Sequence, residues 1–256
     1  MFNQPLPPAQ RASARRAPRA AAAAAAALLA LAHTAWARPV LNGSFEFASK
    51  QDSFSIGRDA TLSNWSVAPA PSGKRVLDCL VAAGDTTGLC GNAFGGGMTF
   101  WVNPGASPDG GNYVAIDGDS GYSNPLTQVV DGLVAGPQYD IRFYQAAAQQ
   151  SGFTGATTER WQLSLGTEQQ LSALMNNANH GAVPWMAQSL RFTATANSEL
   201  LQFVAKGTPN GQPPFVLLDG VAIADVSGVP EPGTLALVGL GLLTVPAARR
   251  FARKLG

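Results

Sequence analysis

Apolar and polar side chains alternate one by one along short segments of residues 38–229, and this pattern limits what the chain can fold into. In YDIRFYQA, Ile141 and Phe143 fall on one side, and Arg142 and Tyr144 fall on the other. A period of two is the signature of a β-strand with one buried face, whereas a helix repeats its apolar positions every three to four residues. These segments are therefore predicted to be strands.

Turn-forming clusters rich in Gly, Pro, Asp and Asn separate the strand segments. About nine or ten short strands with such turns predict an all-β sandwich or barrel. Trp161 falls on the apolar side of its segment and is predicted to be core. TEQQLSALMNN fits a short helical turn or a strand followed by a loop. The clearest further strand segments are RWQLSLG (160–166), SLRFTAT (189–195), ELLQFVAK (199–206) and the almost wholly apolar FVLLDGVAI (215–223).

The N-terminus has the order of features typical of an export signal. Four arginines precede an apolar run at 20–31, and Ala35-Trp36-Ala37 supplies the small residues of a cleavage site. The alternative, a buried Ala-rich helix, does not account for the arginine flank or the cleavage site. The sequence predicts a signal helix within residues 1–37, a β-sandwich domain at 38–228 and a separate C-terminal tail at 229–256. The four arginines are Arg11, Arg15, Arg16 and Arg19.

The tail combines a structure-breaking start, an apolar middle and a basic end. Pro230-Glu231-Pro232 is followed by 15 uncharged residues at 234–248 and then by Arg249 and Arg250. A comfortable membrane-spanning helix needs about 20 residues, so this one would be short. Its basic end would stay in the cytoplasm by the positive-inside rule, which agrees with an N-terminal signal that exports the middle of the chain.

This arrangement resembles the PEP-CTERM sorting signal of exported proteins from Gram-negative bacteria. The resemblance implies that the Sec machinery exports the chain, that the tail holds it briefly in the inner membrane, and that an exosortase then removes the tail. The product would reach the cell surface or the extracellular matrix, commonly together with exopolysaccharide. Retention of the tail as a permanent anchor is the alternative.

Cys79 and Cys90 are the two cysteines of the chain. In an exported protein, two nearby cysteines predict a disulfide that closes a short loop. A metal or redox pair is the weaker alternative, since there is no C-x-x-C spacing and His180 is the one histidine after residue 37.

The charge of the middle region argues against a nucleic-acid partner. Residues 38–229 hold nine Lys and Arg against 15 Asp and Glu, a net charge of −6. Binding to nucleic acid needs a basic face, which this balance does not favour.

The two ends of the domain carry a second resemblance. VLNGSFE (40–46) and LLDGVAI (217–223) resemble the first and last strands of jelly-roll, galactose-binding-like sandwiches found in many carbohydrate-binding modules. The resemblance implies that these segments lie near one another, with a structural Ca²⁺ between Glu46 and Asp219. Calcium needs six to eight oxygen ligands, many of them backbone carbonyls. Otherwise, Glu46 and Asp219 simply cap turns; Gly220 stands where many such modules have a second acidic residue.

Aromatic side chains in turn-rich surroundings are the candidate sugar platforms, because rings stack on the C–H faces of sugars. Trp185 follows a polar, turn-forming stretch, and Tyr122 lies in the loop DGDSGYSNP. Packing is the competing interpretation for both. Tyr144 is expected on an outer face with Arg142 and Gln145.

The function predicted is a non-enzymatic, exported β-sandwich that binds or organises exopolysaccharide. The alternatives are a polysaccharide hydrolase and an adhesive or scaffold protein without glycan specificity. A hydrolase would use carboxylates such as Asp117, Asp119 or Glu159, because glycoside hydrolysis needs two suitably spaced carboxyl groups. The competing interpretation of Asp117 and Asp119 is a hydrogen-bonded turn after a strand.

Overall fold

The computed structural model describes residues 40–68, 77–88, 90 and 97–226, and these residues contain strands but no helix. The predicted signal helix and the sorting tail, including Pro230, Glu231, Pro232, Arg249 and Arg250, lie outside the described residues. The described ranges therefore contain no helix that is long and apolar enough to cross a membrane.

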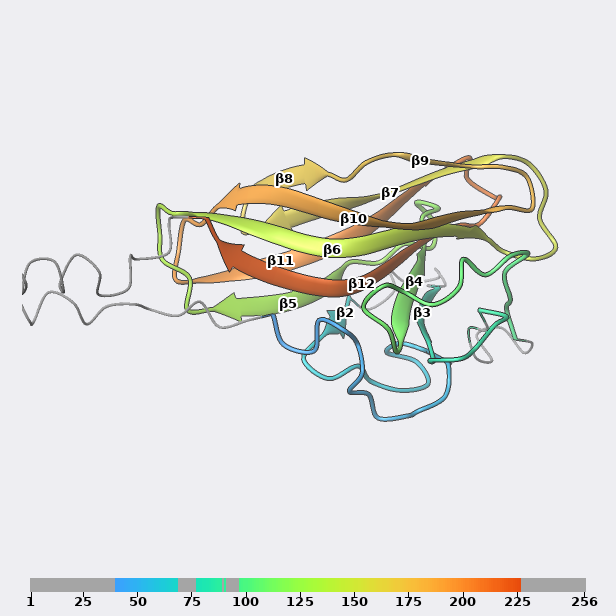
Figure 1. The fold of residues 1–256 in the computed structure, drawn as a ribbon, viewed down its shortest axis with the longest axis horizontal. Helices are drawn as coiled ribbons and strands as arrows, with labels where there is room; N and C mark the ends of the chain where they lie inside the picture. Colours follow the sequence, from blue (N-terminus) through green and yellow to red (C-terminus); the bar gives the residue numbers. More distant parts are fainter. Residues whose placement is uncertain (1–39, 69–76, 89, 91–96, 227–256) are drawn as a thin grey trace, which may run out of the picture. The chain divides into compact units, whose positions relative to one another are not determined.

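In the part of the chain that the structure describes, twelve strands form two sheets (Figure 1). The first sheet has the order β1-β3-β4-β12-β6-β10, and its described pairs are antiparallel. Its three longest strands, β12, β6 and β10, lie side by side. The bounds are β1 (Phe54–Ser55), β3 (Asp78–Val81), β4 (Tyr113–Asp117), β6 (Gln138–Gln149), β10 (Ala182–Thr193) and β12 (Pro214–Asp225).

The second sheet has the order β2-β5-β11-β7-β8, and β9 also pairs with β7. The segment TEQQLSALMNN forms two short strands of this sheet, so of the two predicted alternatives the strand and loop is right and the helical turn is wrong. The bounds are β2 (Ser66–Val67), β5 (Leu126–Asp131), β7 (Thr157–Leu165), β8 (Glu168–Leu171), β9 (Met175–Asn177) and β11 (Ser198–Thr208).

The main core lies between the two sheets and contains the inward-facing residue of each alternating pair. On β6, Ile141 and Phe143 are buried in it; on β7, Trp161 is fully buried, as predicted. The Trp161 indole N–H donates to the carbonyl of Leu217 (3.0 Å), which ties the second sheet to the first. The all-β sandwich predicted from the alternation is therefore confirmed.

Both faces of the first half of β12 (214–219) are buried, which explains why its sequence hardly alternates there. Val216 and Leu218 point into the main core, and Phe215 and Leu217 point to the opposite face of the sheet. A second apolar cluster covers that face.

The two end segments of the domain lie against each other, as the second resemblance implies. The Val221 N–H donates to the Gly43 carbonyl (3.0 Å), beside a register shift in β12 between Asp219 and Ala222. The expectation of a first strand at 40–46 was wrong, because this segment folds into turns around Asn42 and Phe45, both with positive φ. Phe45 instead packs its ring against Trp65 in the core.

Side chains from β8 satisfy backbone groups along the free edge of β10. Glu168 accepts from the Thr193 N–H (2.9 Å), and Gln170 donates to the Arg191 carbonyl.

β10 also has a register shift between Val183 and Met186, where Pro184 lacks an N–H to donate.

Candidate functional site

A groove of about 410 Å³ opens on the outer face of the first sheet. Arg142 and Tyr144 alternate with the core residues of β6, so strand geometry alone points both side chains outward. Ala187 and Ser189 of β10 pair with Tyr144 and Arg142 and form the groove floor beside them. We call this site the outer-face groove; it is lined by Asp109, Arg142, Phe143, Tyr144, Ala187, Gln188, Ser189 and Gly220.

Gly220 allows the groove to form where β12 bulges. Its φ is +60°, a conformation that favours glycine. A Cβ at this position would lie 2.9 Å from the Tyr144 ring and 3.2 Å from the Asp109 side chain. The glycine therefore lets Tyr144, from a strand, and Asp109, from a distant loop, approach one another.

A disulfide-bonded segment covers the part of the same face that adjoins the groove. We call the described residues between β3 and β4 (82–88, 90 and 97–112) the cover. Cys79 of β3 bonds to Cys90 of the cover, which confirms the predicted disulfide. The cover residue Phe100 packs its ring against Phe215 of β12. The outer-face groove is thus the part of this face that the cover leaves open.

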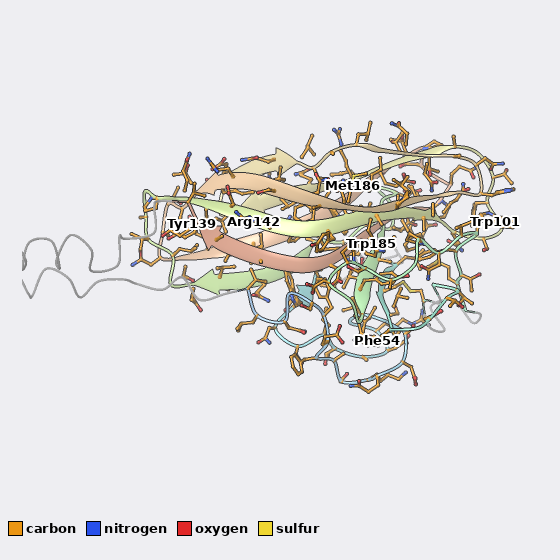
Figure 2. The ribbon with its side chains drawn as sticks, in the orientation of Figure 1. Phe54, Trp101, Tyr139, Arg142, Trp185 and Met186 are labelled. Atoms are coloured by element: carbon orange, nitrogen blue, oxygen red, sulfur yellow. A yellow bond between two sulfur atoms is a disulfide. The ribbon has the colours of Figure 1, made fainter. Side chains whose placement is uncertain are left out.

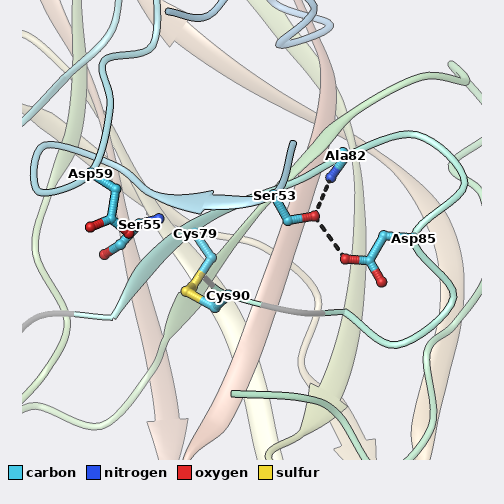
Figure 3. Close-up of a disulfide and its surroundings, with 7 residues drawn as sticks. All are labelled: Ser53, Ser55, Asp59, Cys79, Ala82, Asp85 and Cys90. Carbon is cyan, nitrogen blue, oxygen red and sulfur yellow. Dashed lines mark hydrogen bonds between the residues drawn. A yellow bond between two sulfur atoms is a disulfide. The ribbon is translucent and has the colours of Figure 1, made fainter. Parts of the chain in front are cut away.

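Polar contacts hold the start of the cover next to the disulfide (Figure 3). The Ser53 hydroxyl donates to Asp85 (2.7 Å) and accepts from the Ala82 N–H (2.9 Å). Asp85 Oδ1 also accepts from the Thr87 N–H (2.8 Å), which shapes the following turn.

One end of the groove is basic. Arg191 of β10 makes a two-pronged contact to Asp140 of β6, with Nε at 2.8 Å and Nη2 at 3.2 Å. These bonds and the nearby charges of both arginines lower the pKa of Asp140. Arg142 reaches the same carboxylate only at 3.7 Å, and 62% of its side chain is exposed. Its guanidinium is therefore available to a ligand.

Asp109 makes another part of the groove lining acidic, and the predicted calcium ligands lie close to it. Asp219 is fully buried, and neither carboxylate oxygen has a hydrogen-bond partner among the described residues. Its pKa is raised to about 7, mainly by burial and also by the charges of Asp109 and Glu46, while the Ser107 side chain and the Gly220 N–H act in the opposite direction.

Glu46 and Asp219 are thus brought near one another, as the resemblance implies. Glu46 also accepts from the Asn112 N–H (2.7 Å), a turn-holding contact. In the described ranges, no three His, Cys, Asp or Glu side chains are arranged to hold a metal ion. A cation here would therefore need backbone carbonyls as well. The unpartnered Asp219 oxygens suit such a cation in charge and chemistry.

Trp185 is held mainly by packing, the interpretation that competed with sugar binding. Its indole N–H donates to the Gly105 carbonyl of the cover (3.0 Å), and its ring meets Tyr113 edge-on. The residue is half-buried next to the second apolar cluster rather than among the groove-lining residues. Figure 2 shows it close to Met186, which follows it on β10.

Tyr122 lies in a different place, in a pocket of about 210 Å³ formed partly by Asp117 of β4 and Phe153. Its side chain is exposed, as a platform would require. The two aromatic candidates therefore do not share a site. We call this second site the Asp117 pocket; it is lined by Leu77, Asp117, Tyr122, Gln150, Phe153, Gly211 and Pro213.

Asp117 and Asp119 form the predicted hydrogen-bonded turn after a strand. Asp117 accepts from the Asp119 N–H (2.8 Å), and Asp119 accepts from the N–H groups of Gly121 (2.7 Å) and Gly211 (2.6 Å). Both oxygens of Asp119 are therefore occupied. Asp117 keeps one unpartnered oxygen, and burial raises its pKa to about 7, with Asp119 adding to the shift.

Glu159 points between the two sheets and is fully buried, so it does not join Asp117 in the pocket. The Thr157 hydroxyl donates to it. Burial raises its pKa to about 7, although Thr157 and Asn177 act in the opposite direction.

The positions of two side chains were not predicted. Gln145, expected beside Tyr144 on the outer face, is fully buried and donates to the Ala173 carbonyl (2.9 Å), as strict alternation requires. Trp101 is exposed and stacks on His180, with ring centres 4.1 Å apart. Figure 2 places Trp101 far along the strands from Arg142, so it belongs to neither end of the groove. Its loop context gave no periodic signal.

Comparison with known families matches residues 228–254 to the PEP-CTERM protein-sorting motif. This confirms the sorting signal predicted from Pro230, Glu231 and Pro232. The match covers the tail and not the sandwich. No curated protein matches the chain.

Solved structures similar to the sandwich include carbohydrate-binding modules. TmCBM61, solved with β-1,4-galactotriose, is 14% identical, with a TM-score of 0.40, covering 74% of this chain and 99% of its own. The CBM22-1 xylan-binding domain from Paenibacillus barcinonensis is 13% identical, with a TM-score of 0.35 and coverages of 75% and 97%. The K3 adhesin domain of Lys-gingipain from Porphyromonas gingivalis is 13% identical, with a TM-score of 0.40 and coverages of 73% and 99%.

Proposed function

We propose that this chain is an exported surface or matrix protein whose sandwich binds polysaccharide in the outer-face groove. The observation that carries the proposal is the Tyr144 ring, which lines an open groove together with Arg142 and Asp109. A ring offers a sugar an apolar face, and the flanking charged groups form hydrogen bonds to hydroxyls. Strand β6 holds Tyr144 and Arg142 in place, and the groove is open, which suits a polymer that extends beyond it.

The sorting motif supports the proposed location. The Sec machinery would export the chain, the tail would hold it briefly in the inner membrane of a Gram-negative cell, and an exosortase would process the tail. The groove would then meet the cell's own exopolysaccharide. This polymer is the partner that we propose.

A structural Ca²⁺ held by Glu46 and Asp219 would support the same site. Asp219 precedes Gly220, whose backbone shapes the groove, and the charge of Asp109 acts on the Asp219 carboxyl group. Removing the repulsion among these acids would favour the bulged conformation of β12. The ion would supply charge neutralisation and no chemistry.

Binding is tested by native affinity electrophoresis of the full-length protein, purified in mild detergent, through gels containing exopolysaccharide from the producing cells. We expect the polysaccharide to retard the wild-type protein. Tyr144→Ala should raise the Kd about tenfold, a loss of roughly 1.4 kcal/mol of binding free energy. Tyr122→Ala is the matched control, because Tyr122 is also exposed but lines the Asp117 pocket. Equal retardation of wild type and Tyr144→Ala would exclude the groove as the binding site.

Hydrolysis is the second candidate, favoured by one observation. Asp117 lines a pocket and has a raised pKa, as a general acid does. The occupied oxygens of Asp119 and the inward position of Glu159 leave it without a second carboxylate from the predicted set. Release of reducing ends that Asp117→Asn abolishes would establish a hydrolase. Neither binding nor release would leave a scaffold or adhesive role.

A further inference from the structure

The basic end of the outer-face groove has one arginine more than its carboxylate can neutralise. Arg191 pairs with both oxygens of Asp140, at 2.8 and 3.2 Å. A two-pronged contact of this kind joins the edges of the two planar groups and gives each carboxylate oxygen a charged donor. Arg142 is left with one long contact of 3.7 Å to the same group. Its positive charge therefore remains largely unpaired at the groove.

Arg142 is also placed correctly relative to the proposed sugar platform. It lies two residues before Tyr144 on β6, on the same face of the sheet. This spacing along a strand is about 7 Å. A sugar unit lying on the Tyr144 ring can therefore extend a substituent from its edge to the Arg142 guanidinium.

Asp109 gives the groove a direction. It lies beside Gly220 and Tyr144, next to Asp219, which pairs with Tyr144, whereas Arg142 pairs with Ala222, two residues beyond Gly220. An anionic substituent would be repelled by Asp109 and attracted by Arg142. Sugar hydroxyls, which donate hydrogen bonds, suit Asp109. One sugar unit can satisfy both only with its acidic group towards Arg142.

We propose that the groove selects polysaccharides with carboxylate groups, that is, chains containing uronic acid units. This rests on the proposed function, since it names the class of glycan that the same groove binds. Arginine suits a carboxylate better than lysine would, because its planar fork can donate two parallel hydrogen bonds. Neutral chains would still stack on Tyr144 but would leave Arg142 in water.

The test uses two ligands with the same sugar chain: an oligogalacturonate of defined length, whose carboxylates are free, and its fully methyl-esterified form, which is uncharged. Isothermal titration of the full-length protein should give a Kd at least tenfold lower for the acid than for the ester. Arg142→Gln should remove this preference and leave ester binding unchanged. Arg160→Gln is the matched control, because it removes the same charge from β7 of the other sheet. It should keep the preference.

Two results would overturn the proposal: an ester that binds as well as the acid, or a preference that survives Arg142→Gln. The proposal would also be overturned if neither the acid nor the ester bound. Dextran sulfate, an anionic polymer with sulfate groups instead of carboxylates, completes the set. Binding as tight as that of oligogalacturonate would show attraction to charge alone and would overturn the proposed preference for carboxylates.

The failure of this proposal is distinguishable from the failure of the proposed function. If the acid and the ester bind equally and Tyr144→Ala weakens both, the groove binds glycans without the acidic preference. If Tyr144→Ala changes neither these affinities nor the retardation by exopolysaccharide, the groove is not the glycan site.

Discussion

Gly43 and Val221 meet backbone to backbone, with the Val221 N–H donating to the Gly43 carbonyl at 3.0 Å. A Cβ at position 43 would lie 2.0 Å from the Val221 carbonyl oxygen, a distance that no side chain can occupy. The contact fixes the start of the domain against the bulge of β12, on which the acidic part of the groove depends.

Gly43→Ala is therefore expected to lower the free energy of unfolding by about 1–3 kcal/mol, the usual cost of overpacking. Urea unfolding measures it. Ser44→Ala, at the next and less confined position, should stay within about 0.5 kcal/mol of wild type. An unchanged unfolding midpoint for Gly43→Ala would contradict the close approach.

Replacing both Cys79 and Cys90 by Ala should destabilise the protein by roughly 3 kcal/mol at most, as the chain-entropy model gives for a loop of this length. The separation of the two residues is 11. Reductant should produce a similar shift in wild-type urea unfolding. The double variant should not respond to reductant, and a response from it would point to another cause.

The pH dependence of stability should come largely from buried acids. Burial raises the pKa of Glu159 to about 7 and that of Asp78 to about 8, above the ordinary values of 4.5 and 3.8. Between the ordinary and raised values, the folded protein holds protons that the unfolded chain has lost. The contribution of these two groups to the free energy of unfolding is therefore most favourable below about pH 4, and it falls as the pH rises towards 8.

Glu159→Gln tests this directly, since it replaces the acid with a neutral group of the same shape. It should reduce the proton difference between folded and unfolded states by about one proton near pH 6, and make the protein more stable than wild type at pH 8. Exposed Asp131→Asn should leave the slope unchanged. A Glu159→Gln slope equal to that of wild type would show that Glu159 is ionised in the fold.

Calcium should raise the thermal midpoint of the full-length protein, and chelator should reverse the change. At a Ca²⁺ concentration 100 times its Kd, the added stability would be roughly 3 kcal/mol. Asp219→Asn should abolish the response, and Asp131→Asn should retain it. Identical midpoints in Ca²⁺ and in chelator would leave Glu46 as a turn-holding residue and nothing more.

Alternation along the sequence was enough to predict the strands that carry the groove. It placed Ile141 and Phe143 inside and Arg142 and Tyr144 outside, because a strand with one buried face must alternate. It failed for β12, whose two buried faces erase the pattern, although the apolar run still indicated a buried strand.

The rest of the groove could not be predicted, because it depends on long-range contacts. Asp109 reaches Gly220 from a loop more than 100 residues earlier, and the cover decides how much of the sheet stays open. Trp185 seemed suited to a sugar because of its polar neighbours, and the sequence could not reveal that the Gly105 carbonyl would bind its indole.

The contacts from β8 to β10 bear on how such a protein tolerates crowding. A free strand edge invites pairing with the edge of another molecule. Here the edge strands β1 and β2 have two residues each and β8 has four, and on the long edge of β10 the Thr193 N–H and the Arg191 carbonyl are already bonded to Glu168 and Gln170. Many copies could therefore gather on one polymer without their sheets fusing into fibrils.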